Sequence, residues 1–410
     1  MSTWITVIGI GDDGLVGLSP AARTLIDTAE LLVGGDRHQR MIAETAAERL
    51  TWANGLDAAM DEMERWRGRR VVVLATGDPM YFGAGANLRR RFDADDMVVL
   101  PFPGAFSLAA ARMLWSLADV EMITIHGRPL EVLNLAIQPS ARVIALSRDG
   151  DTPEQAAHLL TERGFGPSMI TVLEHLGGPN ERRVDGVAEH WDHPRCADLN
   201  TLAIECRAGP NARVLPPVPG LPDDLFENDG QLTKREVRAV TVAALAPLPG
   251  QVLWDVGAGS GSVAIEWLRA APGYRAANDQ AARAVAIERG AGRAAMAARN
   301  AAALGVPHLT IIQEEAPQAL ADLEPGPDTV FVGGGISREG LLEACWQRLS
   351  PGGRLVANAV TVEGEARLAA FRAANGGELT RIAVSHAEPV GRLTAFRSAM
   401  DVTQYAGVKP

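Results

Sequence analysis

A run of apolar residues that ends in a glycine-rich turn sets the strongest limit on the fold of this chain of 410 residues. Residues 251–256 have the composition of a strand, residues 257–261 read Gly-Ala-Gly-Ser-Gly, and a helical stretch follows from Val263 to Leu268. Glycines at alternate positions let the backbone approach a ligand closely, and they direct the first amides of the helix toward it. This order predicts an α/β fold with a ligand site at the carboxyl end of the strand.

A second predicted strand, residues 284–287, ends in Glu288. A carboxylate at that place can accept hydrogen bonds from both hydroxyls of a ribose. The turn has the form GxGxG with an acid, Asp255, two positions before it, whereas dinucleotide sites have the form GxGxxG. The pattern therefore favours an adenosine without phosphates over a pyrophosphate.

A proline-rich stretch, residues 207–222, divides the chain and contains five prolines. Such a density of proline predicts an extended, semi-rigid linker. We expect one domain over residues 1–206 and a second over residues 223–410. Both alternate apolar, strand-like runs with helical stretches, which predicts two α/β domains.

The composition excludes several classes of protein. Hydrophobic residues make up 47% of the chain and its net charge is −11, which predicts a globular protein that binds neither nucleic acid nor an anionic membrane. Lys234 and Lys409 are the only lysines, so Schiff-base chemistry is improbable. Three cysteines without a CxxC pair and no apolar stretch of about 18 residues predict a soluble, cytoplasmic protein.

The first half begins with a strand, residues 4–8, followed by a GxGxxG pattern at residues 9–14, which on its own suggests a nicotinamide cofactor. Two features argue against that alternative. The next helix is predicted to begin at Ser19 and Pro20, too far from the glycines to present its amides to a phosphate. The acid expected at the end of the second strand is also absent, because Glu30 precedes residues 31–33.

Four other segments of the first half occur in a characteristic order. They are Gly77-Asp78-Pro79 after a buried strand, Pro-Gly-Ala-Phe-Ser-Leu at 103–108, Ile-His-Gly-Arg-Pro at 125–129 and Val-Leu-Glu-His-Leu-Gly-Gly at 172–178. In this order they resemble the tetrapyrrole methylases, also called class III methyltransferases, and in particular the precorrin C5-methyltransferases. The resemblance implies a unit of two α/β lobes that binds S-adenosylmethionine between them.

The second half resembles the Rossmann-like, class I S-adenosylmethionine-dependent methyltransferases. Residues 232–238, 314–320 and 356–361 resemble the precorrin C15-methyltransferase (decarboxylating) subunits of cobalamin biosynthesis, although the segment from 274 to 283 is longer than usual. Taken together, the chain resembles the fused precorrin-6Y C5,C15-methyltransferase (decarboxylating) family. That family implies two molecules of S-adenosylmethionine, methylation of a reduced tetrapyrrole at C5 and C15, loss of carbon dioxide from the C12 acetate, and precorrin-8X as product. The stand-alone C15 enzymes that the second half resembles are tetrameric, so we expect a homo-oligomer, a tetramer formed through the second domain.

The resemblance assigns contacts with S-adenosylmethionine residue by residue. In the second domain they are Thr233, Gly257, Ala258, Gly259, Ser260, Gly261, Glu288 and Ala316, and in the first they are Asp12, Asp78, Tyr81, Phe106 and Ser107. Because the substrate carries many carboxylates, we predict that arginines bind it, with Arg128, Arg235 and Arg238 as candidates.

No metal site and no covalent nucleophile are predicted. His190, His193 and Cys196 have ligand-like spacing but lack a fourth ligand. Sulfonium is already a strong methyl donor, so alignment and exclusion of water are the main requirements. Two alternatives stay open, namely a nicotinamide oxidoreductase built on residues 9–14 and a carrier that shields a tetrapyrrole without catalysis.

Overall fold

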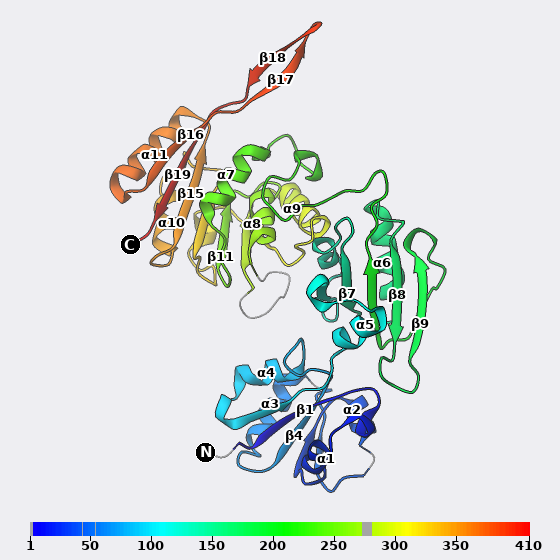
Figure 1. The fold of residues 1–410 in the computed structure, drawn as a ribbon. Coiled ribbons are helices and arrows are strands. Elements are labelled where there is room, and N and C mark those ends of the chain that lie inside the picture. The colour runs from blue at the N-terminus through cyan, green and yellow to red at the C-terminus, as the bar shows by residue number, and fades with distance from the viewer. Residues whose placement is uncertain (1–2, 43, 54, 273–280) are drawn as a thin grey trace. The chain divides into compact units, whose positions relative to one another are not determined.

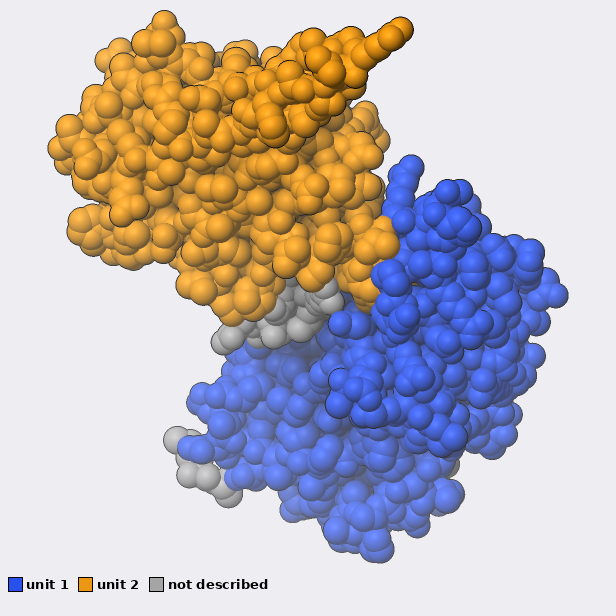
Figure 2. Space-filling model, turned by 45° about the horizontal axis from the view of Figure 1, so that its top comes forward, with its two compact units in different colours: residues 1–130, 139–213 blue, residues 131–138, 214–410 orange. Residues whose placement is uncertain are grey.

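The computed structural model describes residues 3–42, 44–53, 55–272 and 281–410, so most of the long segment 274–283 lies outside the described residues. The chain forms two compact units, coloured separately in Figure 2. Unit 1 comprises residues 1–130 and 139–213, and unit 2 comprises residues 131–138 and 214–410. None of the described helices has the length and apolar character needed to cross a membrane.

The first lobe of unit 1 is a parallel sheet with strand order β3-β2-β4-β1-β5. Its strands are β1 (Ile5–Ile10), β2 (Leu31–Val33), β3 (Glu48–Leu50), β4 (Val71–Thr76) and β5 (Met97–Leu100), and its helices are α1 (Pro20–Asp27), α2 (Asp36–Met41), α3 (Leu56–Glu64) and α4 (Ala84–Arg91). Alternate residues of β4 contribute to two apolar clusters, so both faces of the sheet are covered, as parallel sheets require. The Ser19 hydroxyl accepts a hydrogen bond from the Ala22 amide, which confirms the predicted start of α1.

The second lobe of unit 1 is a mixed sheet with strand order β6-β7-β10-β8-β9. Its strands are β6 (Glu121–Thr124), β7 (Arg142–Leu146), β8 (Met169–Glu174), β9 (Arg182–Val187) and β10 (Asn200–Glu205), and its helices are α5 (Ala105–Met113) and α6 (Thr152–Glu162). Phe106 and Ala109 of α5 pack on Ile144 and Leu173 of this sheet. The start of α5 is thereby held against the second lobe.

Unit 2 contains a seven-stranded sheet with order β13-β12-β11-β14-β15-β19-β16. The first five strands of this order are parallel, and β19 is antiparallel to both its neighbours, β15 and β16, which are labelled in Figure 1. The strands are β11 (Val252–Val256), β12 (Arg283–Ile287), β13 (Thr310–Ile312), β14 (Thr329–Val332), β15 (Arg354–Ala359), β16 (Glu378–Ile382) and β19 (Val402–Val408). The helices are α7 (Arg235–Leu245), α8 (Ser262–Ala270), α9 (Ala291–Ala303), α10 (Leu341–Arg348) and α11 (Val362–Asn375). A hairpin of β17 (Ser385–Val390) and β18 (Leu393–Ser398) projects from this unit (Figure 1).

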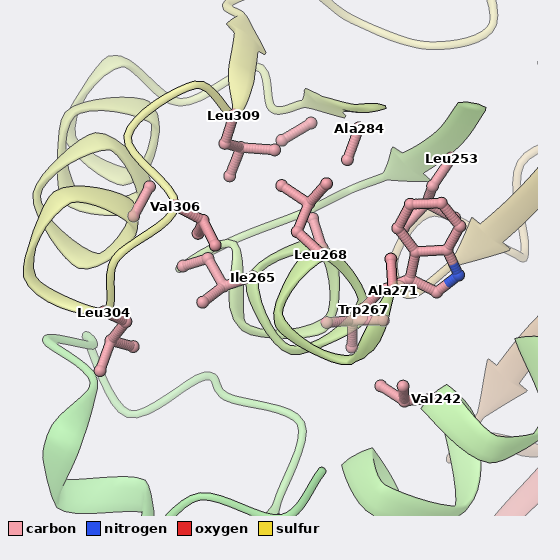
Figure 3. Packing of buried hydrophobic residues seen from close by; sticks show 14 of the residues in the cluster. Val242, Leu253, Ile265, Trp267, Leu268, Ala271, Ala284, Leu304, Val306 and Leu309 are labelled. Carbon is pink, nitrogen blue, oxygen red and sulfur yellow. The ribbon is translucent and has the colours of Figure 1, made fainter. Parts of the chain in front are cut away.

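The core of unit 2 includes a segment that is distant in sequence. Around α8, the side chains of Ile265, Trp267 and Leu268 pack with residues from α7 and from the loop after α9 (Figure 3). Leu135 belongs to the same cluster and is 4% exposed. It fills the space beside Gly305, where an added Cβ would lie 2.9 Å from the Leu135 Cγ. Residues 131–138 therefore complete this core.

The second half of the proline-rich stretch is also part of unit 2. Glu266 of α8 accepts hydrogen bonds from the amides of Gly220 (2.6 Å) and Leu221 (2.9 Å). Arg269, also on α8, donates to the carbonyls of Leu215 and Pro216. Leu221 is fully buried. The structure thus differs from the predicted linker at 207–222. Buried charged side chains form hydrogen bonds with the backbone of residues 215–221 and hold this segment on α8.

Candidate functional site

The glycine turn of unit 2 follows β11 as predicted. Gly257, Gly259 and Gly261 have φ values of +73°, +57° and +76°, in the left-handed region that side chains other than glycine disfavour. A Cβ on Gly257 would lie 2.9 Å from both the Cα and the amide nitrogen of Gly334, in the loop after β14. The turn therefore packs backbone against backbone. A Cβ on Gly259 would meet only the Gln231 carbonyl, at 3.9 Å, so the space beside it is open.

Glu288 lies beside this turn, directly after β12, which confirms the predicted end of the second strand. Its side chain is largely buried, and its two oxygens accept hydrogen bonds from the amides of Gly259 (3.0 Å) and Gly290 (2.8 Å). The carboxylate is thus fixed at the edge of the open space. This is the position from which it can bind ribose hydroxyls.

Asp255 of β11 is a buried carboxyl whose hydrogen bonds are incomplete. Its Oδ2 accepts a hydrogen bond from the Ala264 amide at 3.0 Å, while its Oδ1 has no partner among the described residues. Burial raises the pKa of Asp255 to about 7; the bond from Ala264 opposes this rise, and the charge of Glu288 adds to it. The site thus combines a buried oxygen without a partner among the described residues, an open glycine turn and a carboxylate on the next strand. These features fit a nucleoside with hydrogen-bond donors or a positive charge, such as S-adenosylmethionine.

Thr233 and Ala316 are also predicted contacts. Both are half-buried, and the backbone carbonyl of each accepts a hydrogen bond from an arginine. The Thr233 carbonyl accepts a hydrogen bond from Arg238 and the Ala316 carbonyl accepts one from Arg338. Glu315, next to Ala316, pairs with Arg338 and Arg289, and these guanidinium groups lower its pKa. The segment that precedes Thr233 passes the open side of Gly259, as the position of Gln231 shows. The remaining predicted contacts, Ala258 and Ser260, lie within the turn itself.

The prediction that Arg238 binds a substrate carboxylate is wrong. Its side chain is fully buried, donates to Glu266 at 2.7 Å and to Asp223 at 3.0 Å, and lies over the ring of Phe226. It neutralises a buried carboxylate and supports the fold, so it is not available to a ligand. Arg235 is exposed at the start of α7 and stays a prediction.

In unit 1 the predicted signatures converge at the carboxyl edge of the first sheet. Gly77 has a φ of +62°, and a Cβ on it would lie 2.7 Å from the Cα of Gly104. A Cβ on Gly9 would lie 2.1 Å from the carbonyl oxygen of Gly77. The ends of β1 and β4 and the start of α5 therefore meet with no room for side chains between them. This contact brings together segments that lie far apart in the sequence.

Beside this contact, Tyr81 lies edge-on to Phe82 and Phe106, with ring centroids 4.7 Å and 5.2 Å away. The guanidinium of Arg128 lies 5.4 Å from the ring of Phe82, so three predicted residues gather around one aromatic cluster. Ser107 is exposed on the first turn of α5. The carboxylate of Asp78 accepts a hydrogen bond from the Met80 amide at 2.9 Å and stabilises its own turn.

Asp12, the last predicted contact of unit 1, follows β1 and lies in a polar network. It accepts hydrogen bonds from Arg37 (2.6 Å) and pairs with His175 (3.1 Å). Arg37 also donates to Thr76, which lies 2.9 Å from the buried ring of His38. Burial, and then the charge of Arg37, lower the pKa of His38 to about 4. The sequence analysis missed both partners of Asp12, Arg37 and His175, because they lie far from it in the sequence and His175 belongs to the second lobe.

Two motifs of unit 1 suggested other functions, namely the GxGxxG pattern at residues 9–14 and the ligand-like spacing of His190, His193 and Cys196. A single 3-10 turn follows the GxGxxG pattern, and α1 begins only at Pro20, so the glycines do not face a helix N-terminus. His190 and His193 lie near Glu189 and Asp192, their neighbours in sequence, whereas Cys196 is buried. The part of the chain that the structure describes holds no group of three or more potential metal ligands.

Comparison with known proteins gives matches over the whole chain. A precorrin-6Y C(5,15)-methyltransferase (decarboxylating) from Sinorhizobium sp. is 46% identical over 410 residues, which cover 100% of this chain and 97% of the relative. The chain belongs to the precorrin-6Y C(5,15)-methyltransferase (decarboxylating) family. A member from Mycobacterium tuberculosis (strain CDC 1551 / Oshkosh) is 42% identical, covering 99% of this chain and 100% of the relative.

The domain matches agree with this family. Residues 5–192 match the tetrapyrrole (corrin/porphyrin) methylases and residues 224–409 match the precorrin methyltransferase domain. The crystal structure of the C-terminal domain of the Rhodobacter capsulatus enzyme is 42% identical and covers 47% of this chain and 100% of that chain, with a TM-score of 0.43. The predicted fold class is confirmed, as is S-adenosylmethionine-dependent methylation with decarboxylation in cobalamin biosynthesis at the level of the family.

Proposed function

We propose that the two units carry separate methyl transfers on one precorrin, each with its own molecule of S-adenosylmethionine. Unit 1 methylates C5, and unit 2 methylates C15 and removes the C12 acetate carboxyl group as carbon dioxide, so that the product is precorrin-8X. The observation that carries this proposal is the full-length match, which aligns both folds of one chain with both parts of a fused enzyme. S-adenosylmethionine supplies an electrophilic methyl group on a sulfonium when it is bound.

The residues of unit 2 suit binding and orientation rather than covalent catalysis. Glu288 and the amides of the glycine turn hold the nucleoside, and the open side of Gly259 leaves room for it. The chain contains only two lysines that could form a Schiff base, and both belong to this unit. They are Lys234, at the start of α7, and Lys409, near the C-terminus. Decarboxylation can use the conjugated macrocycle as its electron sink, which agrees with the scarcity of lysine, and the protein contributes alignment and exclusion of water.

In unit 1, Arg128 is the best-placed candidate for a substrate carboxylate. It lies beside the aromatic cluster at which Tyr81 and Phe106 meet, and a guanidinium forms bidentate hydrogen bonds with carboxylates. In unit 2, the exposed Arg235 is the candidate for the same role. The three cysteines are free thiols, which suits a reducing compartment, and we place the protein in the cytoplasm.

Isothermal titration of S-adenosylhomocysteine into the full chain tests the number of donor sites. We expect two sites. Glu288→Ala should weaken one of them about 5- to 150-fold, because hydrogen bonds to a charged group contribute about 1–3 kcal/mol. Glu378→Ala, an exposed glutamate on the edge strand β16, is the matched control and should change neither. A single site in the wild type would reduce the proposal to one methylation.

Mass spectrometry of the tetrapyrrole after incubation with S-adenosylmethionine tests the reaction itself. We expect a gain of two methyl groups with loss of one carbon dioxide. A protein that binds the tetrapyrrole and leaves its mass unchanged would be a carrier, and this result would refute the proposal.

We also propose that the protein is a homo-oligomer formed through the β17–β18 hairpin of unit 2. Leu393, Phe396 and Met400 are more than three-quarters exposed, and in the described residues the hairpin pairs with no third strand. A two-stranded hairpin is marginally stable alone in water, so a second copy of the chain is the natural cover for its apolar side chains. Sedimentation should give an oligomer, tetrameric as the resemblance to the stand-alone C15 enzymes implies. Phe396→Arg should dissociate it, and Glu378→Arg, at an exposed position of β16, should not. A monomeric wild type would exclude this arrangement.

A further inference from the structure

A line of polar side chains crosses the carboxyl edge of the first sheet of unit 1 and ends at a histidine of the second lobe. Arg37 donates to Thr76 (2.7 Å) and to one oxygen of Asp12 (2.6 Å). The other oxygen of Asp12 lies 3.1 Å from Nδ1 of His175, which follows β8. The carboxylate therefore joins a guanidinium on one side to an imidazole on the other.

His175 has an unusual backbone conformation for a residue with a side chain. Its φ is +50°, in the left-handed region, where a residue other than glycine costs of the order of 1–3 kcal/mol. Two backbone hydrogen bonds hold it there, from its amide to the Leu199 carbonyl and from the Gly178 amide to its own carbonyl. The fold thus maintains a strained residue in order to aim its side chain, and such strain is concentrated at functional sites.

The pairing of His175 with Asp12 leaves the other ring nitrogen available. When Nδ1 donates its proton to Asp12, the neutral ring carries its lone pair on Nε2. Nε2 has no partner among the described residues, and the side chain of His175 is 32% exposed. A base oriented by a carboxylate, with its second nitrogen free, is the arrangement that activates histidine for proton transfer.

The loop that carries His175 lies against α5, the helix whose first turn holds two of the predicted donor contacts. A Cβ on Gly177 would lie 3.6 Å from the side chain of Leu108, which is on α5 directly after Phe106 and Ser107. The Gly177 amide donates to Glu181, and Glu181 forms an ion pair with Arg112 at the other end of α5. His175 is therefore fixed to the helix whose first turn holds the predicted contacts with S-adenosylmethionine.

Methylation of a trigonal carbon that bears a hydrogen needs a base. The π electrons of the carbon form the new bond to the methyl group, and the sulfur–methyl bond breaks with its electron pair remaining on sulfur. The carbon then carries both hydrogen and methyl. Removal of the proton returns the C–H electrons to the double bond and restores conjugation. The proton must be accepted by a group beside the carbon.

We propose that His175 is the general base of the unit 1 methyl transfer, that its Nε2 accepts this proton, and that Asp12 is a positioning residue that orients the ring and stabilises the resulting imidazolium. The inference rests on the proposed methylation in unit 1. It gives Asp12 a role different from the predicted contact with the methyl donor.

The test uses the full-length protein with a precorrin substrate and S-adenosylmethionine, and counts transferred methyl groups by mass. His175→Asn keeps a residue that tolerates the left-handed region and removes the base. We expect the methyl transfer of unit 1 to slow about 10²- to 10⁴-fold, while S-adenosylhomocysteine binding and the reaction of unit 2 are unchanged. His158→Asn, an exposed histidine on α6, is the matched control.

Chemical rescue separates catalysis from a structural role. His175→Gly suits the backbone and leaves room for added imidazole, which should restore part of the lost rate. Asp12→Asn should lower kcat and leave the KM for S-adenosylmethionine within about twofold, because positioning acts on the transition state. Recovery with imidazole would support the proposal, and its absence would contradict it.

Two outcomes distinguish failure of this inference from failure of the proposed function. If the wild type transfers both methyl groups and His175→Asn does so at the same rate, only the assignment of the base is wrong. If the wild type transfers no methyl group from unit 1 to the precorrin, the proposed function fails and the inference fails with it.

Discussion

Each unit has, near its candidate site, one buried side chain whose pKa is strongly shifted, and the two groups respond to pH in opposite directions. In unit 2, burial raises the pKa of Asp255 to about 7, and in unit 1, burial lowers the pKa of His38 to about 4. Both side chains lie near the carboxyl ends of parallel strands, where burial disfavours the charged form. The comparison teaches that one physical cause gives the two units of one chain opposite pH dependence.

The largest expected effect comes from the glycine turn of unit 2. Gly257→Ala forces a side chain into a left-handed conformation and against the backbone of Gly334, so we expect donor binding in unit 2 to fall at least about 100-fold. Titration with S-adenosylhomocysteine should then show one site, that of unit 1. Gly352 has a similar φ, +75°, with open space around it, so Gly352→Ala should leave both sites intact. Loss of both sites in Gly257→Ala would show that the two units do not bind the donor independently.

The pH dependence of stability tests the comparison directly. Unfolded Asp255 releases its proton near pH 3.8 and the folded residue near 7, so unfolding releases a proton between these values, and unit 2 loses stability as the pH rises through them. Unfolded His38 takes up a proton near pH 6.5 and the folded residue near 4, so unit 1 loses stability as the pH falls through that range. At its limit the effect is about 4 kcal/mol for Asp255 and about 3 kcal/mol for His38.

Hydrogen exchange of β4 and β11, corrected for intrinsic rates, measures the two stabilities separately in the intact protein. Asp255→Asn should remove the pH slope of unit 2 and leave that of unit 1, and His38→Asn should do the reverse. Parallel slopes in the two units would contradict the opposite burial effects.

The smallest predicted effect concerns the loop that follows His175. A Cβ on Gly178 would lie 2.4 Å from one carboxylate oxygen of Asp12, so Gly178→Ala displaces that side chain and removes no titratable group. We expect the methyl transfer of unit 1 to slow about tenfold, since displacement of a positioned group lowers the rate without abolishing it. Gly292→Ala, at an open position of α9, should leave both transfers unchanged. An unaltered rate in Gly178→Ala would show that the position of Asp12 does not limit the reaction.

The sequence analysis predicted unit 2 better than unit 1, for a physical reason. A strand, a glycine turn and an acid on the next strand are local patterns, so Gly257 and Glu288 could be placed before the structure was known. Asp12 and His175 are 163 residues apart and meet only because two lobes fold together. A left-handed φ at a histidine likewise leaves no mark in the sequence.

Arg238 shows the converse limit of sequence reasoning. Its charge suggested that it binds a substrate carboxylate, but its partner is Glu266 of α8, which is itself buried. Composition cannot tell a substrate-binding arginine from one that neutralises an internal carboxylate. The same limit applies to the proline-rich segment beside Arg238. Proline predicts an extended backbone, but it does not show whether that backbone is a free linker or is packed on a folded unit.

The segment 131–138 has a consequence for how this chain could be divided. Because the neighbouring residues on both sides belong to unit 1, no single cut yields both units whole. A gene split after codon 213 would leave Leu135 on the first polypeptide and expose the apolar surface beside Gly305 on the second. A polar substitution at that surface, or the octapeptide supplied as an added sequence, should therefore make the separated unit 2 less prone to aggregate.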